Sequence, residues 1–449
     1  MPGKTFHIIT LGCKVNQYES AYLEESLVRF GWRRVERDER ADVVVVNTCI
    51  VTGRASYQSR QAIRRQIREN SGALIAATGC YAQVFPEELA AIPGVDIVAG
   101  NTLKGRLPGL LCGMRPSEGA EILREPFSES ICFENLPVSG HPGRTRAFLK
   151  IQDGCNGNCS YCIVPRARGR PRSMDLETVV EALNCFSREG FLEVVLTGIH
   201  LGRYGFDLRP GKDLKALLKR LSREQLPLRI RLSSLEPDEI DRELVDLVAS
   251  NPVFCRHFHV AMQSGDDLVL NMMNRPYTAG TLTKALETIR ERIPEAAIGT
   301  DLIVGFPGES DGMFENTRAL LESLPITYVH VFRFSPRPGT PAAGFKDVIP
   351  HARAKERAAV LRVLGRKKRE GFHSASLGGV YPVIVEGAAQ HGRAEVRGLS
   401  DNYIPLEFSL NGADRRGFVN VHAERLDRDR VIGRVEKENP PGRATHPVT

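Results

Sequence analysis

Three cysteines lie close together in the stretch IQDGCNGNCSYCIVP, residues 151–165. Cys155, Cys159 and Cys162 have the spacing C-x3-C-x2-C. Structural zinc sites use four tetrahedral ligands, and iron–sulfur clusters also usually take four thiolates. Three thiolates on a four-iron cluster leave one iron open to a small chelating molecule. The spacing therefore favours an open iron–sulfur cluster, with zinc as the alternative.

A second set of three cysteines is spread over the first 80 residues. Cys13, Cys49 and Cys80 each follow an apolar run, in TFHIITLG, DVVVVNTC and ALIAATGC. The carboxyl ends of parallel strands share one edge of a sheet, where such sheets bind ligands, so these thiols are expected to converge. The alternative is three buried apolar thiols, because cysteine is often buried. The remaining cysteines show no comparable arrangement and are predicted to be structural: Cys112, Cys132, Cys185 and Cys255.

The composition is that of a soluble globular protein. Of the 449 residues, 42% are hydrophobic and 26% charged, and no run of about 18 apolar residues or secretory signal is present. We therefore expect a cytoplasmic protein without a membrane span, in which a content of ten cysteines points to metal or redox chemistry rather than to disulfides. A net charge of +7 suits an RNA partner, but it also suits an ordinary protein with excess arginine.

The elements that position the second set lie in residues 1–103. Apolar strand-like runs alternate there with helical patterns over residues 16–30 and 56–69, which predicts an open, parallel α/β domain. Residues 104–143 lack clear periodicity and are predicted to be a linker with room for one hairpin.

Residues 144–375 contain six candidate strands with helical segments between them, such as residues 176–189 and 281–292. Six β/α units make a partial (β/α)6 barrel, open on one side, with the three-cysteine loop at the carboxyl mouth where barrel active sites lie. Five short strands over residues 376–438 predict a small antiparallel β-barrel. Residues 439–449 are predicted to be a disordered tail.

The C-x3-C-x2-C loop after the first strand of such a barrel resembles the radical S-adenosylmethionine (SAM) superfamily. Nearly the whole chain is similar to the methylthiotransferases, through TLGCKVNQYES, NTCIVT, ATGCYAQ, IQDGCNGNCSYCIVPRARGRPRS, RLSSLEP, HVAMQSGDDLVLNMMNRPYT and FRFSPRPGTPA. The resemblance implies two 4Fe–4S clusters and two SAM molecules per turnover. One cluster, at Cys155, Cys159 and Cys162, would bind the SAM that yields a 5′-deoxyadenosyl radical. The other, at Cys13, Cys49 and Cys80, would deliver a sulfur that carries a methyl group.

Small and polar residues at successive strand ends fit contacts to SAM, although each is also common in turns. These candidate SAM contacts are Gly198, Ser233, Ser234, Glu236, Gly305 and Gly308. Lys150, just before the cluster loop, is either a substrate or cofactor contact or an ordinary exposed lysine, whose stem could be buried because it lies in a candidate strand.

The motif LGCKVNQYES resembles the branch that methylthiolates carbon 2 of threonylcarbamoyladenosine at position 37 of tRNA. It differs from the GCQMN motif of the isopentenyladenosine branch and from the GCPKN motif of the branch that modifies an aspartate of a ribosomal protein. The resemblance implies a monomer with a C-terminal TRAM domain, whose partners are the tRNA anticodon loop and an electron donor such as flavodoxin or ferredoxin. A non-catalytic RNA-binding metalloprotein stays as a further alternative.

Arginines in two regions are candidate RNA contacts. A row follows the cluster loop in PRARGRPR, and others lie in the predicted C-terminal barrel near Tyr403, which could stack on a base. Both regions could also be ordinary solvated surface. The candidates are Arg166, Arg168, Arg170, Arg172, Arg393 and Arg397.

Overall fold

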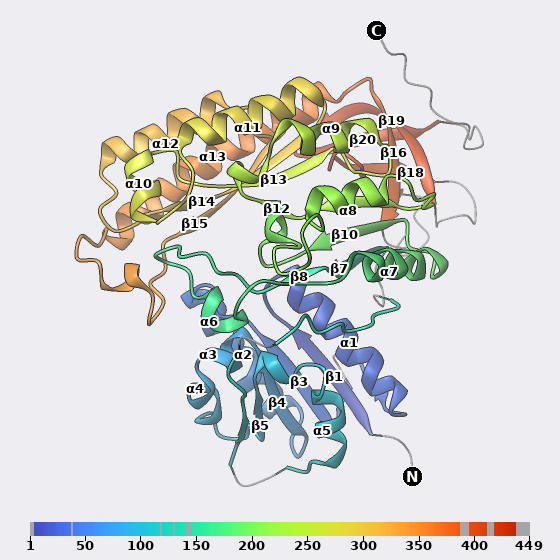
Figure 1. Cartoon of the computed structure of the whole chain (residues 1–449), viewed down its shortest axis with the longest axis vertical. Coiled ribbons are helices and arrows are strands. Elements are labelled where there is room, and N and C mark those ends of the chain that lie inside the picture. The colour runs from blue at the N-terminus through green and yellow to red at the C-terminus, as the bar shows by residue number, and fades with distance from the viewer. Residues whose placement is uncertain are drawn as a thin grey trace.

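The computed structural model describes residues 4–36, 39–116, 119–128, 131–140, 145–386, 395–410 and 417–436. Figure 1 shows an N-terminal sheet domain, a larger open barrel next to it, and a small barrel near the C-terminus. Arg393 and the expected tail at residues 439–449 lie outside the described residues.

The N-terminal domain is a six-stranded parallel sheet with the order β2-β1-β3-β4-β5-β6. Every residue of the two central strands, β3 and β4, is buried, which explains their uninterrupted apolar sequences. The strands are β1 (Thr5–Thr10), β2 (Arg33–Arg34), β3 (Val43–Thr48), β4 (Leu74–Gly79), β5 (Ile97–Ala99) and β6 (Glu121–Leu123). The helices are α1 (Lys14–Arg29), α2 (Gly53–Glu69), α3 (Cys80–Val84), α4 (Pro86–Ala90) and α5 (Leu107–Gly113).

The expectation that residues 104–143 form only a linker is wrong for its first half. Strand β6 pairs in parallel with β5, and α5 buries Leu107 and Leu111 against the sheet. The three-residue edge strand β6 exposes Glu121 and Ile122, so it is too short and too polar to show a strand period. Residues 107–123 thus complete the N-terminal domain.

The central domain confirms the predicted six-unit partial barrel. Its strands form two parallel sheets, β11-β10-β7 and β12-β13-β14-β15, and Ser233 alone separates β11 from β12. The strands are β7 (Arg146–Lys150), β10 (Glu193–Thr197), β11 (Arg229–Leu232), β12 (Ser234–Leu235), β13 (His257–Gln263), β14 (Ala297–Val304) and β15 (Tyr328–Arg333). The main helices are α7 (Leu176–Arg188), α8 (Leu214–Leu221), α9 (Arg242–Ser250), α10 (Asp267–Met272), α11 (Ala279–Arg292), α12 (Asp311–Ser323) and α13 (His351–Ala375).

Strands β7 and β15 are the two edges of the open barrel, and α1 of the N-terminal domain packs beside β7 (Figure 1). Tyr18 and Ala21 of α1 belong to the apolar cluster of the barrel, and the Tyr18 hydroxyl donates to the Leu136 carbonyl at 2.5 Å. The amino end of α1 is therefore held at the open side of the barrel.

The C-terminal strands form a closed barrel with the order β16-β17-β18-β20-β19, in which only β18 and β20 pair in parallel. This confirms the expected small barrel. Two arginines of β11 join it to the central domain: Arg229 Nη1 donates to the Pro382 carbonyl at 3.0 Å, and Arg231 Nη1 to the Asp401 carbonyl at 2.9 Å. The strands are β16 (Val380–Glu386), β17 (Glu395–Ser400), β18 (Pro405–Ser409), β19 (Phe418–Asp427) and β20 (Arg430–Val435).

Tyr403 is partly exposed, and its ring also packs against the central domain. Its ring lies 4.6 Å from His257 and 5.5 Å from Tyr328, measured between ring centroids, at the amino ends of β13 and β15. Its φ of 66° is uncommon for a residue other than glycine, which indicates that the packing determines its conformation. Tyr403 thus forms a contact between the two domains, and its stacking on a base stays a prediction.

Among the described residues, no helix combines the length and the apolar character that crossing a membrane requires.

Candidate active site

The structure brings Cys13, Cys49 and Cys80 to one edge of the N-terminal sheet. Cys13 precedes α1, Cys49 follows β3, and Cys80 begins α3 directly after β4. The three thiols are close enough to influence one another electrostatically, and none forms a disulfide. The convergence expected from strand ends is thus observed.

Asparagines and a glycine shape this edge. Asn16 Nδ2 donates to the Leu11 and Thr48 carbonyls at 2.8 and 3.0 Å, and Asn47 Nδ2 donates to the Asn16 carbonyl at 2.9 Å. Gly79 has a φ of +97°, and a Cβ there would lie 2.4 Å from the Thr48 carbonyl oxygen. A larger residue would clash there and displace Cys80, the next residue.

Cys13 and Cys49 on this edge have raised pKa values. Burial raises the pKa of Cys13, and it raises the pKa of Cys49 to about 12. Metal binding must therefore remove protons from both thiols, so affinity for a metal centre increases with pH.

The other set, Cys155, Cys159 and Cys162, lies in the loop between β8 (Gln152–Asp153) and α6 (Val164–Arg168). The segment after α10 anchors this loop. The Ser160 amide donates to the Met273 carbonyl at 3.0 Å, and its hydroxyl to the Met272 carbonyl at 2.7 Å. Asn274 Nδ2 donates to the Asn158 carbonyl at 2.7 Å. The motif NMMNRPYT carries these contacts, a role that the spacing of the cysteines did not reveal.

His200 is a site residue that the sequence analysis missed. Its Nδ1 lies 3.6 Å from Cys155 Sγ, and its Nε2 lies 2.7 Å from Glu239 Oε1. Burial alone would lower the pKa of His200, but Cys155 and Glu239 raise it to about 10. Burial would raise the pKa of Cys155, yet the hydrogen bonds from His200 and the Gly157 amide outweigh burial and lower it. Cys155 is thus prepared to bind as a thiolate.

Burial raises the pKa of the Cys159 thiol, and it raises the pKa of Cys162 to about 12. Arg275 partly offsets this effect at Cys159 and also donates to Glu236 Oε1 at 2.7 Å. The positive charge of Arg275 suits an anionic cluster in this loop.

The residues that directly follow β11 offer polar atoms to a cofactor. Ser233 Oγ and Glu236 Oε2 are buried and have no hydrogen-bond partner among the described residues. Ser234 Oγ lies 2.8 Å from His259 Nδ1. Buried polar atoms are almost always satisfied, so the two open oxygens suit hydroxyl groups such as those of the ribose of SAM. Gly198 borders the same region, and a Cβ there would lie 2.8 Å from Gln152 Oε1.

The amides of Gly305 and Gly308 already donate within the protein, and the expected approach of their backbone to adenine stays a prediction. The Gly305 amide donates to Glu309 Oε2 at 2.7 Å, and the Gly308 amide donates to the Asp347 carbonyl at 2.8 Å. A Cβ on Gly305 would lie 2.6 Å from the Ala354 Cβ of α13. Both glycines therefore serve turns and close packing, and neither amide is free for a ligand.

A buried charge network lies between the two cysteine sets, and it corrects two predicted RNA contacts. Arg168 is fully buried; its Nε lies 3.3 Å from Cys80 Sγ, and its Nη2 lies 3.1 Å from Glu19 Oε2. Arg172 is also buried, donating to the Arg168 carbonyl at 2.9 Å and lying 3.6 Å from Asp153. Neither arginine can reach a phosphate.

Glu19 is the centre of this network. Its carboxylate also pairs with Lys104 at 3.6 Å and with Lys150 at 3.4 Å. Lys150 is only 2% exposed and lies 3.3 Å from Asp153, so the alternative of an exposed lysine is wrong, and its ammonium group is bound within this network.

Two other arginines of the row, Arg166 and Arg170, line a hollow of about 810 Å³ together with Cys155. Arg166 is exposed and donates to the Pro338 carbonyl at 2.9 Å. In the C-terminal barrel, Arg397 is exposed and pairs with Glu407 at 2.6 Å.

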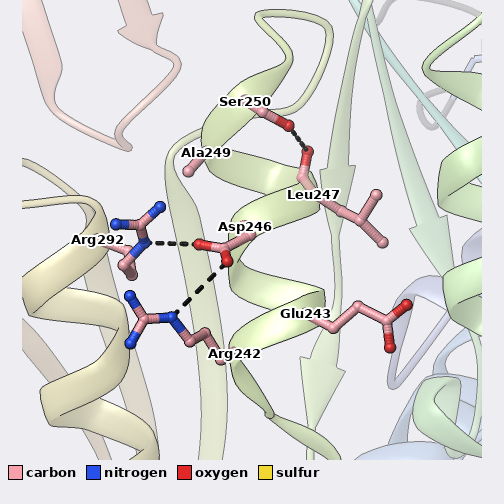
Figure 2. Close-up of a pocket in the computed structure, with 7 residues that line it drawn as sticks. All are labelled: Arg242, Glu243, Asp246, Leu247, Ala249, Ser250 and Arg292. Carbon is pink, nitrogen blue, oxygen red and sulfur yellow. Dashed lines mark hydrogen bonds and ion pairs between the residues drawn. The ribbon is translucent and has the colours of Figure 1, made fainter. Parts of the chain in front are cut away.

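Figure 2 shows another hollow, of about 650 Å³, on α9 and α11. It contains the surface ion pair of Arg292 and Asp246, and none of the six cysteines lines it. Asp246 also lies 3.9 Å from Arg242, so the hollow is lined by surface ion pairs.

Inside the barrel, His259, Asp301 and His330 form the only group of three His, Cys, Asp or Glu ligand atoms within 4.8 Å in the described part of the chain. Asp301 lies 3.4 Å from His259 and 3.3 Å from His330. Burial would raise the pKa of Asp301, but hydrogen bonds from the two histidines outweigh burial and lower it.

Comparisons with known proteins agree with this arrangement. Residues 149–321 match the Radical SAM superfamily, and residues 5–100 match the family described as Uncharacterized protein family UPF0004. The threonylcarbamoyladenosine tRNA methylthiotransferase MtaB of Aquifex aeolicus is 39% identical over 89% of this chain and 95% of its own length. The enzyme of the same name from Bacillus subtilis is 37% identical over 90% and 89%.

A more distant relative is the tRNA-2-methylthio-N(6)-dimethylallyladenosine synthase of Dictyoglomus thermophilum, 34% identical over 89% of this chain and 91% of its own. Among solved structures, the radical SAM methyltransferase TsrM of Kitasatospora setae has the same fold over 76% of this chain and 77% of its own, with a TM-score of 0.54 at 17% identity. The two matched segments, the relatives and the two cysteine sets together show that this chain belongs to the radical SAM methylthiotransferase family.

Proposed function

We propose that this enzyme transfers a methylthio group to carbon 2 of threonylcarbamoyladenosine at position 37 of tRNA. The observation that carries the proposal is the pair of three-cysteine sites, connected through Arg168 and the buried network of Glu19. Relatives named for this substrate, at 33–39% identity, support it. Dimethylallyladenosine synthases are 32–34% identical, so the isopentenyladenosine substrate is the second candidate.

We propose that Cys155, Cys159 and Cys162 hold the 4Fe–4S cluster to which SAM binds. When bound, this group supplies a 5′-deoxyadenosyl radical that can abstract hydrogen from an unreactive C–H bond. The protein's own part is to stabilise and orient. His200 lies against Cys155, and the open oxygens of Ser233 and Glu236 offer partners to the ribose of SAM.

We propose that Cys13, Cys49 and Cys80 hold a second 4Fe–4S cluster. When bound, this cluster supplies the sulfur that takes a methyl group from another SAM. Arg168 would stabilise its negative charge, because the guanidinium points at Cys80 Sγ and is always protonated.

The hollow beside Cys155 is the proposed approach of the anticodon loop. Arg166 and Arg170 would hold phosphates there, which orients the RNA without reading its sequence. Arg397 offers a further exposed cation on the C-terminal barrel. We propose that the protein is a cytoplasmic monomer whose clusters are reduced by a donor such as flavodoxin or ferredoxin. Its proposed domains are residues 1–123, 144–375 and 376–438.

Deleting the gene and analysing tRNA nucleosides by mass spectrometry tests the substrate. The methylthio form of threonylcarbamoyladenosine should vanish, while methylthio-isopentenyladenosine should remain. Loss of methylthio-isopentenyladenosine with retention of the threonylcarbamoyl nucleoside would instead indicate the isopentenyladenosine substrate. A mass change in a ribosomal protein would indicate that the enzyme modifies an aspartate of that protein. About eight irons per chain, rather than zinc, are expected on elemental analysis.

A further inference from the structure

The motif FRFSPRPGTPA, residues 332–342, belongs to neither cysteine set, yet it contacts the surroundings of both. Its first two residues end β15, an edge strand of the open barrel. Residues 335–342, here the connecting segment, leave that edge and contact helix α2 of the N-terminal domain.

The connecting segment is stiff. The Thr340 amide and hydroxyl both donate to the Arg337 carbonyl, at 3.1 and 2.8 Å, which closes a turn over residues 337–340. Proline at the second position of this turn and glycine with a φ of +82° at the third are typical of a type II turn. Pro336 and Pro341 restrict the backbone on either side of it. A segment of this kind can hold its two ends at a fixed separation.

The first half of the segment is bound to α2. The Gly53 amide, at the start of this helix, donates to Ser335 Oγ at 2.8 Å, and Arg337 Nη2 donates to Ser56 Oγ at 2.9 Å. Arg337 is only 7% exposed, and its Nε has no hydrogen-bond partner in the described part of the chain. Burying a charge with so few partners costs free energy of folding, so stability alone does not explain this arginine.

Helix α2 links this contact to the site of Cys13, Cys49 and Cys80. Ser59, about one turn after Ser56, accepts a hydrogen bond from the Cys49 amide and donates one to the Cys49 carbonyl, both at 3.1 Å. Both serines are buried on the same helix, so a shift of α2 at Ser56 also moves the backbone of Cys49.

The end of the segment is bound to the loop that carries Cys159 and Cys162. The Ala342 amide donates to the carbonyl of Ser160, which lies between these cysteines, at 2.8 Å. Ala342 is also part of a small apolar cluster against which Tyr161 of the same loop packs. The segment and the loop therefore hold one another in place.

We propose that the connecting segment sets the separation of the two three-cysteine sites and that Arg337 is its positioning residue. This inference rests on the proposed function, because the target base must meet a radical from one site and a sulfur from the other. SAM cleavage needs only one site, whereas methylthio transfer needs both. Misplacing reacting groups by about 1 Å costs on the order of 100-fold in rate, so a loosened segment should uncouple the two steps.

The test compares variants of the anaerobic holoenzyme on an anticodon stem-loop RNA that carries threonylcarbamoyladenosine. Arg337→Gln should keep about eight irons and cleave SAM at close to the wild-type rate, but should form methylthio product about 10- to 100-fold more slowly. Arg337→Lys should restore part of the product, because its ammonium group can still donate to Ser56. Ser335→Ala should lose about 2- to 10-fold, since it removes a neutral hydrogen bond and leaves no buried charge unpaired.

Pulsed EPR of the reduced holoenzyme without RNA gives a second measurement, the dipolar coupling between the two reduced clusters. The distance distribution should be narrow in wild type and broader or shifted in Arg337→Gln. Arg362→Gln is the matched control, because it removes an exposed arginine of α13 that donates to the Val331 carbonyl at 3.1 Å within the central domain. This control should keep the wild-type ratio of methylthio product to 5′-deoxyadenosine and the wild-type distance distribution.

If Arg337→Gln and Ser335→Ala with full iron give the wild-type product ratio and distance distribution, the connecting segment does not set the separation of the sites. A parallel loss of iron, SAM cleavage and product in both variants would show a purely structural role and would also overturn the proposal. Should Arg337→Gln not fold, the result with Ser335→Ala decides. A wild-type enzyme that cleaves SAM but forms no methylthio product would instead contradict the proposed substrate, and the EPR comparison would still test the segment.

Discussion

Replacing Glu19 by glutamine leaves three buried cations, Arg168, Lys104 and Lys150, without their shared carboxylate. Removing one partner from a buried ion pair typically destabilises a protein by about 3–5 kcal/mol. With a urea dependence of about 3 kcal/mol per molar, the unfolding midpoint should fall by about 1–1.7 M. Glu24→Gln on the same helix is the control, because its surface pair with Arg34 at 2.8 Å contributes at most about 1 kcal/mol.

The single tryptophan of the chain, Trp32, reports this transition because it is buried in the core of the N-terminal sheet. Urea titrations of both anaerobic variants, followed by its fluorescence, give the two midpoints. If the Glu19→Gln midpoint is no lower than that of Glu24→Gln, the network does not stabilise the domain contact and the reasoning fails.

The pH dependence gives an independent check. Burial would raise the pKa of Glu19, but Arg168 and the two lysines outweigh burial and hold it well below its usual range. Because the folded-state pKa is lower than the unfolded value of about 4.3, the stabilisation is complete above that pH and is lost as the pH falls below it. The midpoint difference between wild type and Glu19→Gln should therefore persist at pH 7 and decrease only in acid.

Three further outcomes follow from the site. Cys159→Ala should abolish 5′-deoxyadenosine formation, whereas Cys49→Ala should still cleave SAM but yield no methylthio nucleoside. Chromatography with mass spectrometry measures both products. Loss of SAM cleavage in Cys49→Ala would refute the division of roles between the two cysteine sets. His200→Leu should lower the reduction potential of the neighbouring cluster by on the order of 60 mV, because it removes a hydrogen bond and a positive charge from Cys155. An unchanged potential in a redox titration monitored by EPR would contradict this expectation. Arg166→Gln should weaken tRNA binding and reduce the slope of log affinity against log salt by about 1 in fluorescence anisotropy, whereas an unchanged slope would remove Arg166 from the RNA path.

The cysteine positions could be predicted because each follows a strongly apolar strand. Cys49 and Cys80 come at the ends of strands that are buried throughout, so the strand pattern alone places them at one edge. The position of the loop at Cys155 could be predicted from the first strand of the barrel and the spacing of the three thiols. The domain order followed from the change in element type along the chain.

Arg168 shows why the rest could not be predicted. In sequence, it stands in a row of arginines that suits a solvated or RNA-binding face. Its main counter-charge, Glu19, is 149 residues away, and only the docking of α1 on β7 brings the two together. His200 and Arg275 were missed for the same reason, since each lies far along the chain from the cysteine that it influences.

The position of Tyr403 has a consequence for engineering. A small C-terminal barrel invites exchange between enzymes as a removable cassette, with a junction near residue 376. Here, residues 399–403 contribute carbonyls to Arg229 and Arg231 and a ring to His257, so they join this barrel to strands β11 and β13 of the central domain. A chimera that replaces this barrel without matching those contacts would leave the two buried arginines of β11 without these carbonyl partners. The cassette and the catalytic barrel must therefore be exchanged together or co-designed at that seam.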